Sequence, residues 1–244
     1  MEENEGYSYS VLQKDLQRLK EKYEFLEFGN IGYSVLGRPI PYIRLGIGPN
    51  EVMYAAAFHA NEWITSPVLM KFVEEYAEKY NQNGFIYEYN VRELFNKSSI
   101  YIIPMVNPDG VDLVTGAIPL NTGIYNQFKD ISLNFPSIPF PDGWKANFNG
   151  VDLNLQFPAS WESARQIKFA QGYTKPAPRD FVGYGPLTEP EALAIYNFTL
   201  AHNFRLILAY HTQGEVIYWK YGDYLPPYSE QIGQMFSEAS GYAL

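Results

Sequence analysis

The sequence predicts an α/β fold, in which a single domain holds a mixed, mostly parallel, twisted sheet with helices on both faces. Short apolar runs that suit buried strands alternate along the chain with segments of helical periodicity. The length of 244 residues suits one large domain, and the hydrophobic fraction of 46% is enough for a sizeable core. Neither an internal repeat nor an interdomain linker is evident, so we expect one domain over residues 1–244.

The predicted helices share apolar residues spaced three and four apart, with charged residues between them. They fall at residues 9–23, 61–80, 188–202 and 229–244. Pro67 lies within the first turns of the second helix, where a missing N–H is tolerated. Thr188 is the expected N-cap of the third helix, and acidic residues follow it in the first turn.

Nearly continuous apolar runs predict strands that are covered on both faces. These runs lie at residues 51–58, 98–106 and 204–211. Two shorter strands with glycine and proline punctuation are expected within residues 24–48, and a further strand is expected at residues 215–219. The tetrapeptide "NPDG" after the second run predicts a turn. Residues 116–160 show little periodicity and predict a long loop, which in a compact domain is usually functional or disordered.

Composition excludes several classes of function. The net charge is −9 and no basic face is visible, so we expect no nucleic-acid partner. The absence of cysteine excludes disulfides and thiolate catalysis. No apolar run approaches the ~20 residues that a membrane helix needs, and the start "MEENEGYSYS" lacks the pattern of a secretory leader. We expect a cytoplasmic protein, although a secreted protein cloned without its leader would look the same.

Two of the three histidines, His59 and His211, each end a predicted buried strand, where open α/β sheets bind their ligands. Glu62 follows three residues after the first of them. Two imidazoles and one carboxylate form the protein ligand set of a catalytic zinc site, whose fourth position holds water. A lone histidine at a strand end is more often structural, so the second strand-end histidine carries the argument. His202 lies at a helix end, where a cation suits the dipole, and is expected to be structural.

Five motifs extend this interpretation. In chain order they are "FHANEWITSP", "IPMVNPDGV", "GVDLN", "PLTEPEA" and "YHTQGEVIYW". Together they resemble the zinc metallocarboxypeptidase superfamily, and most closely its bacterial γ-D-glutamyl-L-diamino acid (meso-diaminopimelate) peptidases. The resemblance runs from about residue 7 to the end of the chain. It implies a carboxypeptidase-like fold, one Zn²⁺, and hydrolysis of the γ-D-glutamyl-meso-diaminopimelate bond in peptidoglycan stem peptides or muropeptides. No separate wall-binding domain is recognised.

The resemblance also implies roles for individual residues. His59, Glu62 and His211 match the three metal ligands of the family. Asp152, in "GVDLN", matches the carboxylate that orients a zinc-bound imidazole. Lys145, in "GWKAN", stands where digestive members carry an arginine that stabilises the oxyanion; a lysine supplies the charge without the planar fork, and a solvated surface role is its alternative.

The chain departs from the exopeptidase pattern at the residues that bind substrate. Asn154 is kept, but Leu155 replaces the arginine that clamps a terminal carboxylate. Leucine cannot form that bidentate pair, so we expect no requirement for a free C-terminal α-carboxylate at this position. Asn154 either contacts the substrate or forms an Asx-type turn.

A second departure concerns the general base, which in the family is a glutamate on a late strand some tens of residues after the third ligand. Only 33 residues follow His211. Their acids are assigned no catalytic role: Glu215, Asp223, Glu230 and Glu238. We therefore expect a C-terminally truncated domain that lacks its last strand or strands and its base, with weak or absent activity.

Two alternatives remain open at this stage. One is a non-catalytic protein that retains zinc and binds peptidoglycan fragments. The other is a carbohydrate-active protein, suggested by an aromatic content of 17% and by the acidity, which would need paired carboxylates at ~5 to 9.5 Å and no metal. Zinc analysis separates the second alternative from the peptidase, and a muropeptide cleavage assay separates the first.

Overall fold

The computed structural model describes residues 6–244. Residues 1–5, which form half of the stretch used above to judge the absence of a leader, lie outside the described residues. The chain divides into two compact units, Met1–His211 and Thr212–Leu244. The expectation that residues 1–244 form one domain stays a prediction.

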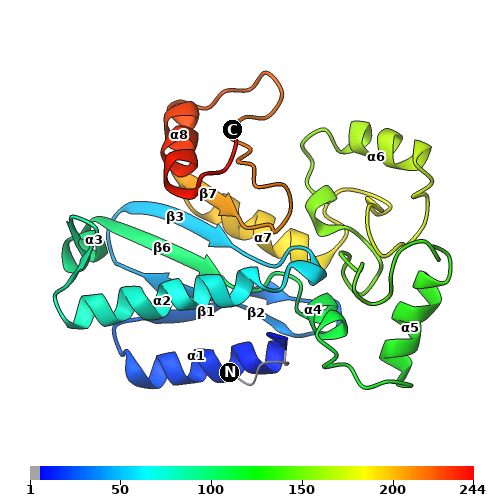
Figure 1. Ribbon diagram of the computed structural model, residues 1–244, viewed down its shortest axis with the longest axis horizontal. Coiled ribbons are helices and arrows are strands. Elements are labelled where there is room, and N and C mark those ends of the chain that lie inside the picture. Colours follow the sequence, from blue (N-terminus) through cyan, green and yellow to red (C-terminus); the bar gives the residue numbers. More distant parts are fainter. Residues whose placement is uncertain (1–5) are drawn as a thin grey trace. The chain divides into compact units, whose positions relative to one another are not determined.

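The first unit is built on a five-stranded mixed sheet with the order β1-β2-β6-β3-β7 (Figure 1). The strands are β1 (Glu27–Tyr33), β2 (Pro39–Leu45), β3 (Asn50–Ala55), β6 (Ser98–Ile103) and β7 (Leu206–Ala209). β1 pairs antiparallel with β2, and β2 pairs antiparallel with β6. β6, β3 and β7 run parallel, which confirms the predicted α/β class with a mixed sheet.

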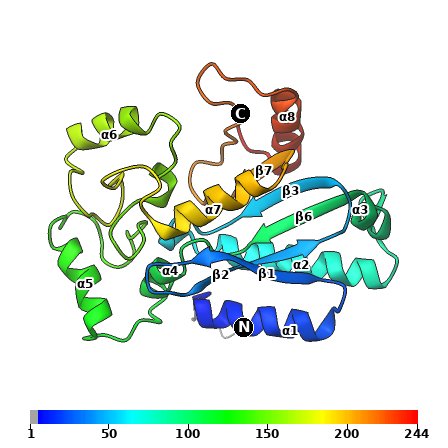
Figure 2. The same cartoon turned by 180° about the vertical axis from the view of Figure 1, so that it is seen from behind.

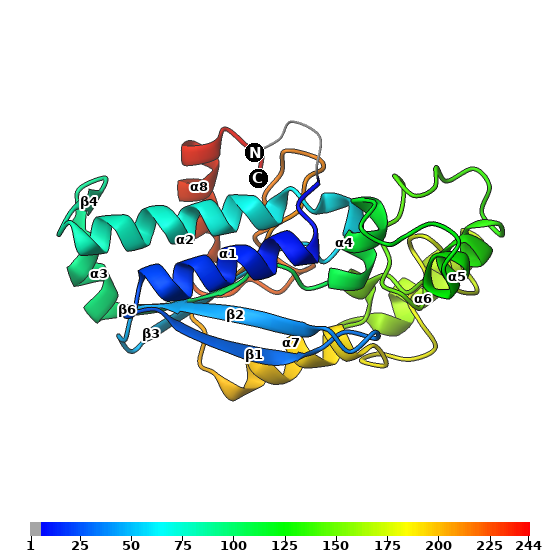
Figure 3. The same cartoon turned by 90° about the horizontal axis from the view of Figure 1, so that it is seen from below.

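Helices cover both faces of this sheet, as Figure 3 shows, with α1 (Tyr9–Lys22) and α2 (Thr65–Asn81) on one face and α7 (Pro190–Ala201) on the other. The view from behind shows α7 crossing the sheet (Figure 2). Alternating residues of β6 serve the two faces: Ile102 packs in the cluster beneath α1 and α2, while Tyr101 and Ile103 pack in the cluster beneath α7.

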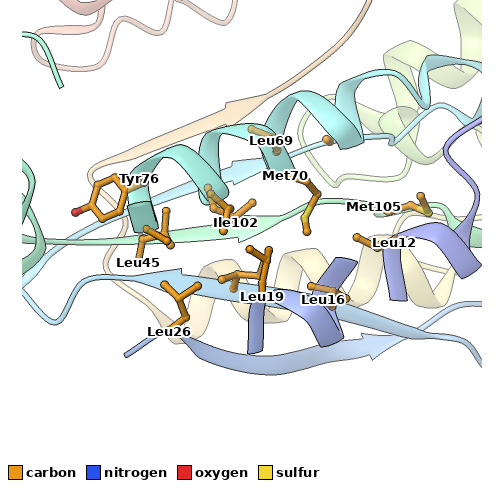
Figure 4. Packing of buried hydrophobic residues seen from close by; sticks show 14 of the residues in the cluster. Leu12, Leu16, Leu19, Leu26, Leu45, Leu69, Met70, Tyr76, Ile102 and Met105 are labelled. Carbon is orange, nitrogen blue, oxygen red and sulfur yellow. The ribbon is translucent and has the colours of Figure 1, made fainter. Parts of the chain in front are cut away.

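The larger hydrophobic core lies between α1, α2 and the sheet (Figure 4). Leu12, Leu16 and Leu19 of α1 are spaced four and three residues apart, so one buried stripe faces the core. Ser8 caps the helix by accepting a hydrogen bond from the N–H of Val11. Leu12 is fully buried in this core, and removing such a side chain typically costs about 2–5 kcal/mol.

The remaining elements of the first unit are short. They are η1 (Ala60–Glu62), β4 (Phe85–Ile86), β5 (Tyr89–Asn90), α3 (Val91–Lys97), α4 (Pro108–Val114), α5 (Gly123–Ser132), η2 (Leu153–Leu155) and α6 (Trp161–Ala170).

Two local predictions between residues 107 and 132 were wrong. "NPDG" begins the helix α4, because the Asn107 side chain caps it and Pro108 occupies its first turn. α5 lies inside the predicted loop of residues 116–160, where Thr122 caps it. Ile124, Phe128 and Ile131 have the helical spacing of an apolar face, but asparagine, proline and glycine on both sides hide that pattern.

Three further predictions need correction. The run at residues 204–211 was expected to be buried on both faces, but β7 is an edge strand whose Ile207 is 44% exposed. Residues 215–219 form no strand; Val216 makes only an isolated bridge with Ala243. The N-cap of α7 is Glu189, one residue after the predicted Thr188. The N–H and the hydroxyl of Thr188 instead donate to Oε1 of Gln156.

The second unit contains one helix, α8 (Ser229–Ser240). Gly233 on this helix lies against Trp219 and Leu244, where a larger side chain would meet both. Within the described residues, no helix is both long and apolar enough to cross a membrane.

Candidate metal centre

The parallel strands β3 and β7 bring two histidines together. Ala55 and Ala209 are register partners at the ends of these strands, and the N–H of Tyr210 continues the ladder to the carbonyl of Ala55. His59 and His211 therefore lie beyond the carboxyl ends of these two strands, with ring centroids 4.9 Å apart. The carboxyl edge of parallel strands is where α/β sheets place their ligands.

Glu62 joins the two histidines because the chain folds back through η1. Its N–H bonds the carbonyl of His59 at 3.2 Å. The hydroxyl of Thr65 donates to the carbonyl of Glu62 at 2.7 Å and accepts from the N–H of Ala57, which fixes the turn. The carboxylate then reaches both imidazoles: Oε1 lies 3.1 Å from Nδ1 of His59, and Oε2 lies 2.8 Å from Nδ1 of His211.

The arrangement of these donor atoms fits a divalent metal ion. One ligand atom from each of His59, Glu62 and His211 lies within 4.8 Å of the others. Nδ1 of His59 is buried and makes no hydrogen bond, although Glu62 is close, as expected for a nitrogen directed at a shared cation. Two imidazole nitrogens and a carboxylate are the donor types of zinc sites. The His211 side chain is 29% exposed, so the cluster is open to solvent on that side.

The charges of the site favour a cation between its carboxylates. Burial lowers the pKa of His59, but Asp152 and Glu62 outweigh it and raise this pKa to about 9. Burial raises the pKa of Glu62, and the two histidines reverse that effect and hold this pKa far below its usual range. The cluster therefore stabilises a positive charge on the His59 ring, between Glu62 and Asp152.

Asp152 lies behind His59, on the side away from Glu62. Its Oδ1 is 3.2 Å from Nε2 of His59, and the carboxylate also accepts the N–H groups of Asn154 and Asp180. Burial raises the pKa of Asp152, while His59 and these N–H groups lower it to a net depressed value. When the His59 ring is neutral, an ionised Asp152 favours the proton on Nε2 and leaves Nδ1 available as a ligand.

Lys145 lies beside the cluster, Asn154 and Leu155 follow Asp152 in η2, and the roles of all three stay predictions. Nζ of Lys145 is 3.3 Å from Oε1 of Glu62, and its side chain is buried. Asn154 is exposed, and the Asx-type hydrogen bond considered for it is instead made by the Asp152 side chain, which caps η2. Leu155 is half-buried.

Sequence reasoning missed Asn107 as a supporting residue. Its Nδ2 donates to the carbonyls of Phe58 at 3.2 Å, Lys145 at 3.4 Å and Ala146 at 2.9 Å, while Oδ1 accepts the N–H of Gly110. One buried amide thus joins the residue before His59 to the loop that carries Lys145. The available signal was an asparagine at the end of a buried strand, which was interpreted only as part of a turn.

A buried acidic pair at the start of α7 was also missed. Nδ2 of Asn147 donates to Glu189 at 2.7 Å and to Glu191 at 3.1 Å, and Glu191 also accepts the N–H of Val35. Burial raises the pKa of Glu191 to about 7. These acids were expected to complement the helix dipole, whereas they hold the loop around residue 147 to α7.

His202 is not part of the cluster. Its Nδ1 lies 3.0 Å from Oε1 of Glu51, and its ring stacks on Phe204. The four acids after His211 all belong to the second unit.

The fold and the donor set together define an α/β protein with a candidate catalytic metal centre. A profile described as zinc carboxypeptidase matches residues 12–243. This chain belongs to the zinc carboxypeptidase family, a family of zinc peptidases, as the sequence motifs indicated.

Individual relatives agree with this assignment. The γ-D-glutamyl-L-diamino acid endopeptidase 1 of Lysinibacillus sphaericus is 44% identical over 238 residues, covering 98% of this chain and 58% of that protein. The protein YqgT of Bacillus subtilis is 38% identical over 243 residues, covering 99% of this chain and 63% of that protein. The chain thus spans about three fifths of the length of these relatives.

Among solved structures, the carboxypeptidase A from Helicoverpa armigera superposes with a TM-score of 0.69 at 22% identity. The match covers 97% of this chain and 54% of that one. This likeness supports the carboxypeptidase-like fold.

Proposed function

We propose that this chain carries the metal centre of a zinc-dependent peptidase that hydrolyses the γ-D-glutamyl-meso-diaminopimelate bond of peptidoglycan stem peptides. The observation that carries the proposal is the convergence of His59, Glu62 and His211 at one edge of the sheet. The name of the Lysinibacillus sphaericus relative suggests a γ-D-glutamyl-L-diamino acid bond, and the resemblance of the sequence motifs suggests meso-diaminopimelate as the diamino acid. The substrates would be stem peptides or muropeptides.

In this proposal Nδ1 of His59, the carboxylate of Glu62 and Nδ1 of His211 hold one zinc ion. Bound zinc polarises a carbonyl and lowers the pKa of its water to about 7. Asp152 keeps the His59 ring in the orientation and tautomer that present Nδ1. Lys145 places a positive charge beside Glu62, where it can stabilise an oxyanion.

We assign no general base among the described residues. Loss of a base typically lowers the rate by about 10² to 10⁴, so we expect hydrolysis by this chain to be slow. For the same reason the second candidate function is binding of peptidoglycan fragments at a zinc-loaded site without cleavage. Membership of a zinc peptidase family leaves the carbohydrate-active alternative without support.

Zinc stoichiometry and muropeptide digestion, measured on one protein preparation, test the proposal. We expect about one zinc per chain and slow release of the diaminopimelate-containing product by mass spectrometry. H59A should lose both, whereas H202A, which alters a histidine outside the cluster, should keep the zinc. Wild-type protein that binds no zinc would refute the metal centre, while zinc with peptide binding and no cleavage would favour the second candidate.

A further inference from the structure

A short segment, Pro178 to Asp180, is attached to the metal centre at both of its ends. The carbonyl of Pro178 accepts the N–H groups of Lys145 at 2.7 Å and Ala146 at 2.9 Å. The N–H of Asp180 donates to Oδ2 of Asp152 at 3.1 Å. Arg179 therefore lies between the backbone anchor of Lys145 and the carboxylate that holds His59.

The Arg179 side chain is available to a ligand. It is 39% exposed, and its one hydrogen bond among the described residues runs from Nε to Oδ2 of Asp180 at 2.6 Å. The other oxygen of Asp180 accepts from Nζ of Lys168, so two cations share one carboxylate. The two terminal nitrogens of Arg179 are still able to donate.

The neighbouring side chains are less suited to bind a carboxylate of the peptide. Lys145 is buried in contact with Glu62, where the proposed function assigns it to an oxyanion. Leu155 follows the exposed Asn154 and has no group that pairs with a carboxylate. A guanidinium, in contrast, presents a planar fork of donors that matches the geometry of a carboxylate.

We propose that Arg179 determines substrate specificity by binding a carboxylate of the peptide next to the scissile bond. The identity of the peptide rests on the proposed function. A glutamate linked through its γ-carboxyl keeps a free α-carboxylate, and the diamino acid that follows carries carboxylates of its own. Either source offers the same chemistry to the guanidinium, and the experiment distinguishes them.

The test compares three ligands on the full chain. The first is L-Ala-γ-D-Glu-meso-diaminopimelate. The second carries an amide in place of the α-carboxylate of D-Glu, and the third carries amides on the diaminopimelate carboxylates. Dissociation constants are measured by calorimetry for wild type, R179Q and R179K, with R165Q as the matched control because Arg165 pairs with Glu162 on the exposed α6. Hydrolysis is followed in parallel, with kcat and KM separated.

We expect one amidated ligand to bind wild type about 10-fold or more weakly than the parent, as the loss of a charge-assisted pair predicts. That ligand identifies the carboxylate that Arg179 binds. R179Q should bind the parent ligand as weakly as wild type binds that amidated ligand. Amidation should cause no further loss of affinity in R179Q. R179K should be intermediate, because the charge remains without the fork, and R165Q should match wild type. The effect should fall on KM rather than on kcat.

The outcomes that overturn the inference are clear. Equal binding of all three ligands by wild type, absence of binding of the parent peptide, or a carboxylate preference retained in R179Q would each refute it. The first two need no variant, so a folding defect cannot obscure them. A chain without zinc or cleavage that still shows the Arg179-dependent preference would refute the proposed hydrolysis and leave the inference standing.

Discussion

Oδ1 of Asp152 lies 3.2 Å from Nε2 of His59, on the far side of the ring from Glu62. One buried carboxylate thus sets the tautomer of a proposed metal ligand. We expect D152N to bind zinc about 10- to 100-fold more weakly, because the amide no longer selects the Nε2 proton. Competition with a chromophoric chelator measures this affinity. D142N, at an exposed position, is the control, and an unchanged affinity in D152N would remove Asp152 from the site.

Glu191 should make stability depend on pH. Burial raises its pKa from an ordinary value of 4.5 to about 7, so the native state binds the proton more tightly than the unfolded chain does. The stability from this group is complete below pH 4.5 and is lost as pH rises through 7, a loss on the order of 3 kcal/mol. The free energy of urea unfolding at pH 5, 6, 7 and 8 should fall less steeply in E191Q than in wild type.

The slope with pH, and not the absolute stability, is the quantity to compare for Glu191. A glutamine can still accept from the N–H of Val35, but it loses the hydrogen bond from Asn147. The free energy of unfolding of E191Q therefore differs from that of wild type at every pH. E162Q, at an exposed salt bridge, should keep the slope of wild type. Parallel curves for E191Q and wild type would contradict the assignment.

Asn107 should matter for both stability and metal binding. N107A leaves the carbonyls of Phe58, Lys145 and Ala146 without this donor, and unsatisfied buried groups typically cost about 1–3 kcal/mol. We expect a loss of at least about 2 kcal/mol in denaturant unfolding, together with weaker zinc binding, because the residues around His59 and Lys145 are no longer joined. N203A, on an exposed loop, should alter neither, and a stable N107A with normal zinc affinity would show that the loop is held by other contacts.

The core between α1 and α2 offers a test of the packing. Leu12 is fully buried, so L12A should lower the free energy of unfolding by about 2–5 kcal/mol. L120A removes the same atoms from a side chain that is 69% exposed and should change it by less than about 0.5 kcal/mol. Similar values for the two variants in urea titrations would mean that α1 is not docked as described.

Local sequence patterns identified the features that depend on a single element. The runs that became β3 and β7 ended near His59 and His211, and parallel pairing then brought the two histidines together as expected. Features that depend on tertiary contact were missed. Asn107 and Glu191 look like ordinary turn and helix-start residues until the chain folds over them, and only the anchors of Pro178 and Asp180 give Arg179 its place.

The exposed β7 was mispredicted for a related reason, since an apolar run does not say how many neighbours a strand will have. Among the named strands β3 is its only partner, and none of its four residues, Leu-Ile-Leu-Ala, is charged or a proline. Such an edge strand lacks the charged and proline residues that usually prevent pairing with a strand of another molecule. At high concentration this polypeptide should therefore form oligomers through hydrogen bonds between β7 strands, and I207K should stay monomeric, which analytical ultracentrifugation would measure.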